Sequence, residues 1–196
     1  EQQREFTWTI GIDHGHDVSA QVALLICIDV TDPKDAHIYV VDEYISGEAG
    51  ANKHARGILE MLQRNDLEIA DISLWTGDRP HKGRKSGEGK MSNQFLMSGF
   101  ANELGYPKQG LPFKIKTAYK PRWSVIYGCQ TLHERMISSK FQIFPNCEMT
   151  IKSLKNWATK SNGLLDTLSE HKHCIDAMRY AIIQIIDSNF RVKSPS

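Results

Sequence analysis

Three acidic side chains stand where a regular element ends or begins. Asp13 and Asp78 each close a short apolar stretch of strand length, and Asp176 lies early in a helical stretch, three residues after His173. A carboxylate at the end of a buried strand loses hydration unless a partner compensates for it. Carboxylates that meet repel each other unless a cation neutralises them, and such hard oxygen donors suit Mg²⁺ or Mn²⁺.

These acids, if they meet, could hydrolyse a phosphodiester. Two metal ions about 4 Å apart activate water and stabilise the leaving oxygen. We expect Asp13 to bridge both ions and Asp78 and Asp176 to complete one each. We expect His173 to be a further ligand or to hydrogen-bond the scissile phosphate. Simpler roles stay open: turn residues for Asp13 and Asp78, an acid favoured near a helix start for Asp176, and a surface or packing histidine for His173.

Basic side chains follow Asp78 and recur near a later strand. Residues 79–91 form a glycine-rich basic loop, and lysines alternate through 113–117. A nuclease needs cations that hold phosphates near its acidic centre, although an ordinary solvated loop has the same composition. The candidate DNA-binding residues are Lys82, Arg84, Lys85, Lys90, Lys114 and Lys116, with Lys120 and Arg122 just beyond. No recognition helix or zinc finger is present, so base-specific reading is not expected.

Composition places these residues in a folded protein. The chain has 196 residues, 40% of them hydrophobic, and a net charge of +1, which fits one domain over 1–196. No apolar run approaches the roughly 20 residues needed to span a bilayer, and no signal-peptide pattern is present. Cys27, Cys129, Cys147 and Cys174 are scattered without zinc-site spacing and are expected to be free buried thiols. The start at Glu1 suggests an excised fragment.

The first half of the chain predicts a sheet that positions Asp13 and Asp78. Apolar stretches at 6–12, 22–28 and 38–44, joined by short turns, predict an antiparallel meander, and the unbroken apolar run at 22–28 predicts a strand buried on both faces. Residues 52–65 have helical periodicity and precede a strand over 72–75. Such a strand–helix–strand passage usually makes a parallel crossover. Strands one and four would then end at the same sheet edge, beside each other.

The second half predicts mostly helices. Ser92 is expected to cap a helix over 93–104, with an apolar stripe of Phe95, Leu96, Phe100 and Leu104. A fifth strand is predicted over 113–117, and the last helix over 168–187 has Asp176 at the margin of its apolar stripe. The remaining expected elements are helices over 124–139 and 150–158, a short extended piece over 141–145 and a frayed tail over 189–196.

This order resembles the ribonuclease H-like (retroviral integrase) superfamily. More narrowly, the chain resembles the C-terminal nuclease domain of the large terminase subunit of tailed bacteriophages. Residues 10–15 (Ile-Gly-Ile-Asp-His-Gly), 74–78 (Leu-Trp-Thr-Gly-Asp) and 173–181 (His-Cys-Ile-Asp-Ala-Met-Arg-Tyr-Ala) carry the resemblance. The last stretch is the most specific, because His-x-x-Asp is followed by a small residue and Arg-Tyr. The resemblance covers most of the chain.

The resemblance implies an α/β fold with a mixed five-stranded sheet flanked by helices. It implies a DNA endonuclease that uses two Mg²⁺ or Mn²⁺ ions to cut concatemeric viral DNA during packaging in the host cytoplasm, at the procapsid portal. The implied partners are double-stranded DNA, an ATPase motor, the small terminase subunit and the portal, with no membrane and a monomeric isolated domain. This chain lacks the motor's phosphate-loop motif. Family members often carry a second acid beside the last one, whereas Cys174 and Ile175 stand here, so the second ion is expected to have fewer ligands.

Three alternatives stay open. A Holliday-junction resolvase or transposase of the same superfamily would share the acids. A sugar-kinase or actin-like ATPase shares the Ile-x-Ile-Asp-x-Gly strand but needs a second phosphate loop and a duplicated chain, and neither is present. A DNA-binding packaging module with a degenerate site would be favoured by loss of an acid, yet all three are present. His14, His16 and Asp17 are interpreted as loop residues rather than ligands.

Overall fold

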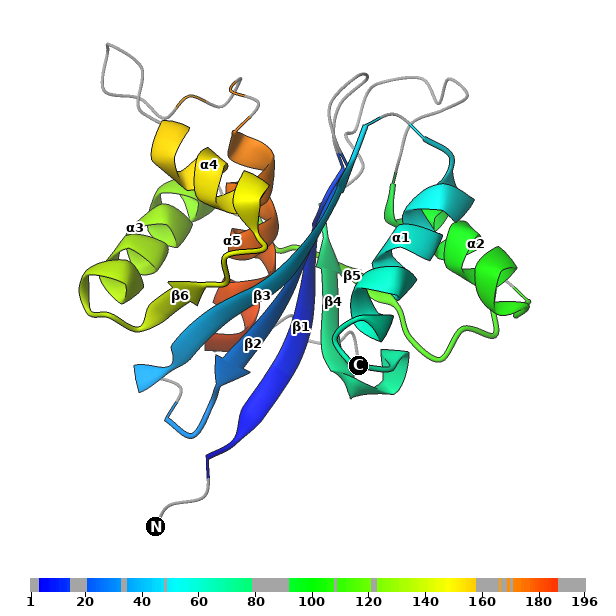
Figure 1. The fold of residues 1–196 in the computed structure, drawn as a ribbon, viewed down its shortest axis with the longest axis horizontal. Helices are drawn as coiled ribbons and strands as arrows, with labels where there is room; N and C mark the ends of the chain where they lie inside the picture. Colours follow the sequence, from blue (N-terminus) through cyan, green and yellow to red (C-terminus); the bar gives the residue numbers. More distant parts are fainter. Residues whose placement is uncertain are drawn as a thin grey trace.

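A six-stranded mixed sheet in the order β5-β4-β1-β2-β3-β6 divides the molecule, and helices cover both of its faces (Figure 1). The computed structural model describes residues 4–14, 21–32, 35–47, 49–78, 92–107, 109–120, 123–157, 166, 169 and 171–186. The strands are β1 (Phe6–Asp13), β2 (Gln21–Asp29), β3 (His37–Ser46), β4 (Ile72–Gly77), β5 (Ile115–Thr117) and β6 (Phe141–Ile143). The helices are α1 (Ala51–Gln63), α2 (Asn93–Leu104), α3 (Ser124–Ile137), α4 (Glu148–Asn156) and α5 (Lys172–Ile186), with a 3-10 turn at Ile69–Asp71.

The topology predicted for the first half is confirmed. Strands β1, β2 and β3 form an antiparallel meander, and β4 pairs with β1 in parallel after the α1 crossover. Every residue of β2 is buried, as its unbroken apolar run predicts. Successive side chains of β2 point to opposite faces of the sheet, so Leu24 and Ile26 join one core while Ala23 and Leu25 join the other.

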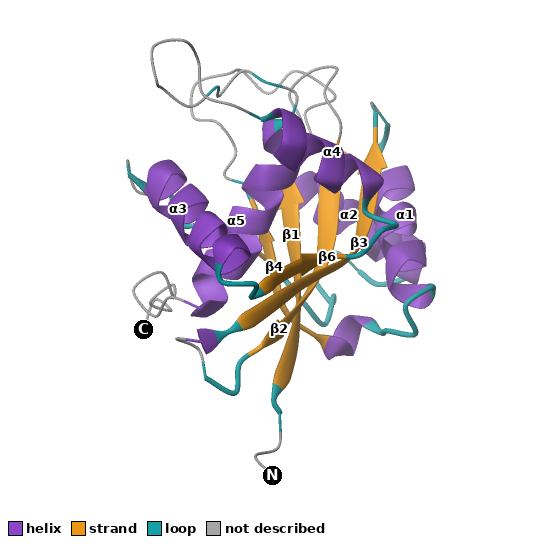
Figure 2. Ribbon diagram, turned by 60° about the vertical axis from the view of Figure 1, so that its left-hand side comes forward, coloured by secondary structure: helices purple, strands orange, loops and turns teal. Residues whose placement is uncertain are grey.

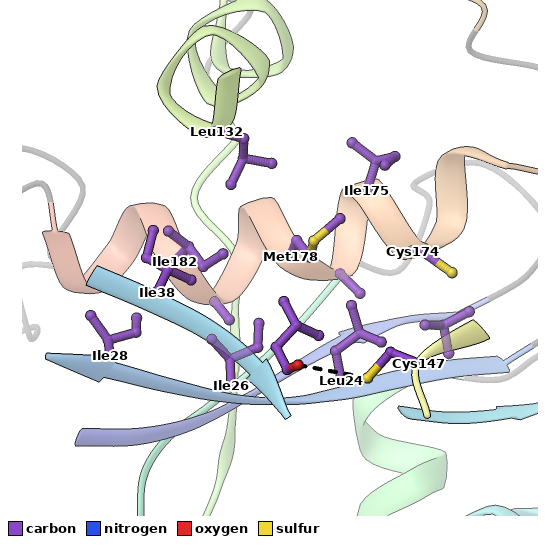
Figure 3. Packing of buried hydrophobic residues seen from close by; sticks show 14 of the residues in the cluster. Leu24, Ile26, Ile28, Ile38, Leu132, Cys147, Cys174, Ile175, Met178 and Ile182 are labelled. Atoms are coloured by element: carbon purple, nitrogen blue, oxygen red, sulfur yellow. Dashed lines mark hydrogen bonds between the residues drawn. The ribbon is translucent and has the colours of Figure 1, made fainter. Parts of the chain in front are cut away.

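The two cores lie on opposite faces of the sheet. Helices α3, α4 and α5 cover one face and α1 and α2 cover the other (Figures 1 and 2). Met178 and Ile182 of α5 point toward Leu24 and Ile26 of β2, and Leu132 of α3 reaches the same core from above (Figure 3). In the described ranges no helix is long and apolar enough to cross a membrane.

In the second half of the chain, the number of strands and the start of β5 differ from the prediction. The predicted five strands become six, because the extended piece after α3 pairs in parallel with β3, with Phe141 opposite Ile38. The open edge of β3 offers backbone hydrogen bonds that even a three-residue strand can use. Strand β5 begins at Ile115 rather than at Phe113. The Phe113 ring instead packs on Trp75 with a centroid separation of 4.4 Å, which takes it off the strand.

Helix boundaries agree within a few residues, but one core assignment is wrong. Ser92 caps α2 as predicted, accepting a hydrogen bond from the Phe95 backbone N–H at 3.2 Å. Leu96 and Phe100 are fully buried, whereas the Phe95 side chain is 40% exposed. The apolar stripe of α2 is therefore narrower than the sequence pattern suggests. Helix α5 begins at Lys172, four residues later than predicted.

Strand β1 and helix α5 approach each other closely. A Cβ atom on Gly11 would lie 2.8 Å from the carbonyl carbon of Ala177, closer still to its oxygen, and 3.0 Å from the Ala181 Cβ. Small residues on both elements therefore let the helix lie directly on the strand. This approach fixes the depth at which α5 sits over the end of β1.

A buried carboxylate joins β3 to the segments after α1 and before α4. Asp42 is 5% exposed and accepts two hydrogen bonds from Arg64, at 2.6 and 2.9 Å, and one from the Asn65 amide at 2.6 Å. The Asn146 amide donates a fourth at 3.2 Å. Burial alone would raise the pKa of Asp42, but the hydrogen bonds and the Arg64 charge outweigh it and lower the pKa below its ordinary value.

The Gly11→Ala substitution should lower the free energy of unfolding by about 1–3 kcal/mol, because the added methyl group forces α5 away from β1. Gly47→Ala is the matched control, since a Cβ there meets nothing within 4 Å. Urea unfolding of both variants measures the difference. Equal stability of the Gly11→Ala variant and the wild type would show that there is room for a methyl group between β1 and α5.

The Asp42→Asn variant should be destabilised at neutral pH by about 1–3 kcal/mol, because it loses charge-assisted hydrogen bonds. The folded-state pKa of Asp42 lies below the unfolded value of about 4, so its contribution is present above that value and lost as the pH falls through the folded-state pKa. The stability gap between variant and wild type should therefore shrink between about pH 5 and pH 2. A gap that stays constant would contradict this, and the exposed Glu134→Gln variant serves as control.

Candidate active site

Asp13 and Asp78 lie side by side at the carboxyl ends of two neighbouring parallel strands. Strands β1 and β4 are parallel with Ile12 opposite Gly77, and each aspartate is the next residue along its chain. Asp13 is 3% exposed, and the side chain of Asp78 is 13% exposed. The prediction that the crossover brings these two residues together is therefore confirmed.

Helix α5 brings His173 to Asp13. The His173 Nδ1 atom lies 2.5 Å from Asp13 Oδ2, and both side chains are buried. A carboxylate oxygen can only accept, so the imidazole N–H donates. The interpretation of His173 as a surface histidine is wrong. The hydrogen bond restricts the orientation of both the imidazole and the Asp13 carboxylate, because both groups are buried.

Asp176 lies one turn further along α5 and pairs with Arg179. Arg179 Nη2 donates to Asp176 Oδ1, and Nη1 donates to the Ser124 carbonyl at 3.2 Å. The Arg179 side chain is 4% exposed and passes over Gly128, where a Cβ would lie 2.7 Å from its Cδ. Burial raises the pKa of Asp176, the Arg179 guanidinium opposes that rise, and the Asp13 charge adds to it.

Lys120 joins Asp78 to helix α5. Its Nζ atom lies 2.5 Å from Asp78 Oδ1 and 2.7 Å from the Tyr180 hydroxyl, and it faces the Tyr180 ring at 4.7 Å from the centroid. The backbone N–H of Ala118 donates to the Gly77 carbonyl at 2.8 Å, which fixes the chain after β5 against the end of β4. Lys120 was expected only as one of several phosphate-binding lysines. Its partners Asp78 and Tyr180 lie 42 and 60 residues away in the sequence, so no local sequence pattern predicts these contacts.

The three aspartates lie on three elements that meet at this end of the sheet: Asp13 ends β1, Asp78 follows β4 and Asp176 lies on α5, which bonds to Asp13 through His173. The pKa of the Tyr180 hydroxyl is raised first by burial and then by the charges of Asp176, Asp13 and Asp78. Carboxylate oxygens from neighbouring elements are the kind of ligand that Mg²⁺ and Mn²⁺ prefer. As the side chains point now, no three acidic, histidine or cysteine side chains among the described residues are close enough to hold one ion together. Each aspartate instead faces a partner of its own, which is His173 for Asp13, Lys120 for Asp78 and Arg179 for Asp176.

His14 is buried rather than part of a solvated loop. Its Nδ1 lies 3.0 Å from Gln21 Oε1 and its Nε2 lies 2.6 Å from Asn93 Oδ1. This polar chain joins the end of β1 to the starts of β2 and α2, so His14 is a loop residue, as predicted, with a buried side chain. No local sequence signal could have found these contacts, because the Asn93 partner lies 79 residues away. His16 and Asp17 lie outside the described residues.

The predicted DNA-binding residues are only partly described. Lys114 and Lys116 are exposed, and Lys116 lies on β5 opposite Thr76 of β4, two residues before Asp78. The remaining predicted cations, together with loop 79–91 and tail 189–196, lie outside the described residues: Lys82, Arg84, Lys85, Lys90 and Arg122.

The cysteines take no part in the site. All four are free thiols, and Cys27, Cys147 and Cys174 are buried. Burial raises the pKa of Cys27 to about 11 and that of Cys147 to about 12, so neither is a thiolate near neutral pH. Cys174 and Ile175 both belong to the core around α5, with Ile175 on the side of the helix that faces away from the sheet (Figure 3), and neither side chain has an oxygen that could ligate an ion.

Comparison with known proteins gives a consistent result at the level of structure. No protein-family model and no curated protein matches the chain. The nuclease domain of the P22 large terminase matches with a TM-score of 0.62 and 20% identity, covering 97% of this chain and 85% of that one. The nuclease domain of the large terminase from bacteriophage SPP1, solved with bound Mn, matches with a TM-score of 0.59 and 20% identity, covering 91% and 86%.

A longer protein matches over the same region. A large terminase from a thermophilic bacteriophage matches with a TM-score of 0.61 and 12% identity, covering 89% of this chain but only 38% of that one. At these identities the likeness establishes the fold. The chain thus has the ribonuclease H-like fold of large terminase nuclease domains.

Proposed function

We propose that this chain is a metal-dependent DNA endonuclease and forms the nuclease part of a terminase large subunit. The observation that carries the proposal is that Asp13 and Asp78 follow the paired ends of β1 and β4, while helix α5, which carries Asp176, contacts both of these ends through His173 and Tyr180. The fold shared with the P22 and SPP1 nuclease domains supports it, as does the Mn bound in the SPP1 structure. In this proposal the substrate is concatemeric viral DNA, cut during packaging.

The three aspartates would together hold two metal ions. Bound Mg²⁺ or Mn²⁺ lowers the pKa of water and stabilises charge on a phosphate. Around that centre, His173 holds the Asp13 carboxylate through its Nδ1–H, and Arg179 holds one oxygen of Asp176. The buried positions of Asp13 and His173 reduce the competition from water for these contacts.

Basic side chains near the carboxyl ends of β4 and β5 would bind the DNA backbone. Lys114 and Lys116 are exposed beside β4, and further candidates follow Asp78 in the sequence: Lys82, Arg84, Lys85 and Lys90. Phosphate contacts of this kind position a duplex without reading its sequence. The further proposed partners are an ATPase motor, the small terminase subunit and the portal, at the procapsid in the host cytoplasm. The large terminase of the thermophilic bacteriophage, 38% of which is covered by this chain, is long enough to include further domains.

Asp13→Asn should reduce Mn²⁺-dependent nicking of supercoiled plasmid by about 100-fold or more, since it removes a charged ligand that stabilises the transition state. Wild-type cleavage should stop in EDTA. The exposed Asp66→Asn variant should cleave like the wild type, and thermal unfolding should show that Asp13→Asn is folded. Unchanged cleavage by Asp13→Asn would refute the proposed centre. Faster cleavage of a four-way junction than of a duplex would favour a resolvase instead.

His173→Ala should lower the cleavage rate about 10- to 100-fold at limiting Mn²⁺, because residues that orient a ligand usually matter to that extent. The loss should diminish at high Mn²⁺ if the role is orientation of Asp13. His133→Ala, at an exposed position of α3, is the control. A loss that persists unchanged at saturating Mn²⁺ would instead indicate that His173 acts on the substrate.

A further inference from the structure

The two cations that face candidate metal ligands differ in their freedom to move. Arg179 is 4% exposed, is hydrogen-bonded to the Ser124 carbonyl and fills the space over Gly128. The Lys120 side chain is 27% exposed and reaches the site on a flexible four-carbon stem. Asp176 is therefore held by a fixed partner, and Asp78 by one that can leave.

Lys120 uses the same carboxylate that a metal ion would need. Its ammonium nitrogen lies 2.5 Å from Asp78 Oδ1, and a bound Mg²⁺ lies about 2.1 Å from its ligand oxygens. Two cations on one oxygen would repel each other strongly in a site shielded from water. Lys120 must therefore leave Oδ1 before that oxygen can ligate an ion, and an ion on Oδ2 would still be repelled by the neighbouring ammonium.

We propose that Lys120 is a built-in competitor for the metal site, and that its release from Asp78 sets the affinity of the site for divalent ions. The inference rests on the proposed metal site and deepens it. Lys120 is a positioning residue in this account, because it acts through Asp78.

Tyr180 gives the released ammonium a second contact. The Tyr180 hydroxyl accepts from Lys120 at 2.7 Å, and its ring lies under the ammonium at 4.7 Å. A cation over an aromatic ring is favoured by electrostatic attraction to the ring face. Lys120 can thus give up Asp78 and remain beside α5, which lowers the cost of its release compared with a lysine that has one partner.

A purely structural ion pair predicts a different result. A partly exposed pair contributes little to stability, and its loss would leave metal affinity unchanged or lower it. If Lys120 competes with the ion, its removal should raise the metal affinity, because the cation that shares the Asp78 carboxylate is gone. Metal affinity therefore separates the two roles, and it does so without any cleavage assay.

The test is calorimetric titration of Mn²⁺ into the 196-residue chain and its variants. Lys120→Met, which keeps the length of the side chain but not its charge, should bind Mn²⁺ about three- to tenfold more tightly than the wild type. Lys120→Arg keeps the cation and should bind no more tightly than the wild type. Lys155→Met, at an exposed position of α4, should match the wild type. Thermal unfolding in EDTA checks each fold, and Lys120→Gln replaces Lys120→Met if the latter is unfolded.

Each outcome decides between the claims. Tighter binding by Lys120→Met, with Lys120→Arg and Lys155→Met unchanged, supports the inference. Equal or weaker binding by Lys120→Met while the wild type binds Mn²⁺ overturns the inference alone. Absence of Mn²⁺ binding by every chain, including the wild type, refutes the proposed metal site, and the inference with it.

Discussion

The close approach of helix α5 to strand β1 is the constraint on which the candidate site depends. Gly11 has no side chain, so the backbone of α5 at Ala177 can lie directly against the strand. That approach sets the height of the helix over the sheet, and His173 and Tyr180 follow on turns to either side of it. A bulkier residue at Gly11 would move these side chains away from the strand ends, since the interior of a protein transmits such shifts.

The site balances negative charge with protein cations and donors. Asp13 faces His173, Asp78 faces Lys120, and Asp176 faces Arg179. Acids in a buried position are tolerated only with such partners. The partners are not equivalent, because Arg179 is enclosed while Lys120 reaches in from the surface. The Asp176 carboxylate therefore has an enclosed cationic partner, whereas the cationic partner of Asp78 has room to move, which would suit the proposed binding of ions.

Much of the fold and part of the site could be predicted from the sequence. The unbroken apolar run of β2 predicted a strand buried on both faces, and the parallel crossover expected for a strand–helix–strand passage placed Asp13 beside Asp78. Helical spacing put His173 and Asp176 on one side of the last helix. Lys120 could not be assigned to Asp78, because that contact depends on how β5 ends against β4. The pairing of β6 likewise depends on an edge of β3 that only the folded sheet provides.

The proposed function requires Asp13, Asp78 and Asp176 to lie close enough together to hold divalent ions. A crystal structure of the chain with Mn²⁺, with the ion located by its anomalous scattering, tests this most directly. We expect a Mn²⁺ ion ligated by Asp13 together with Asp78 or Asp176. The Lys120 ammonium should no longer contact any Asp78 oxygen that binds the ion. Occupied Mn²⁺ sites elsewhere on the chain, with none at Asp13, would contradict it.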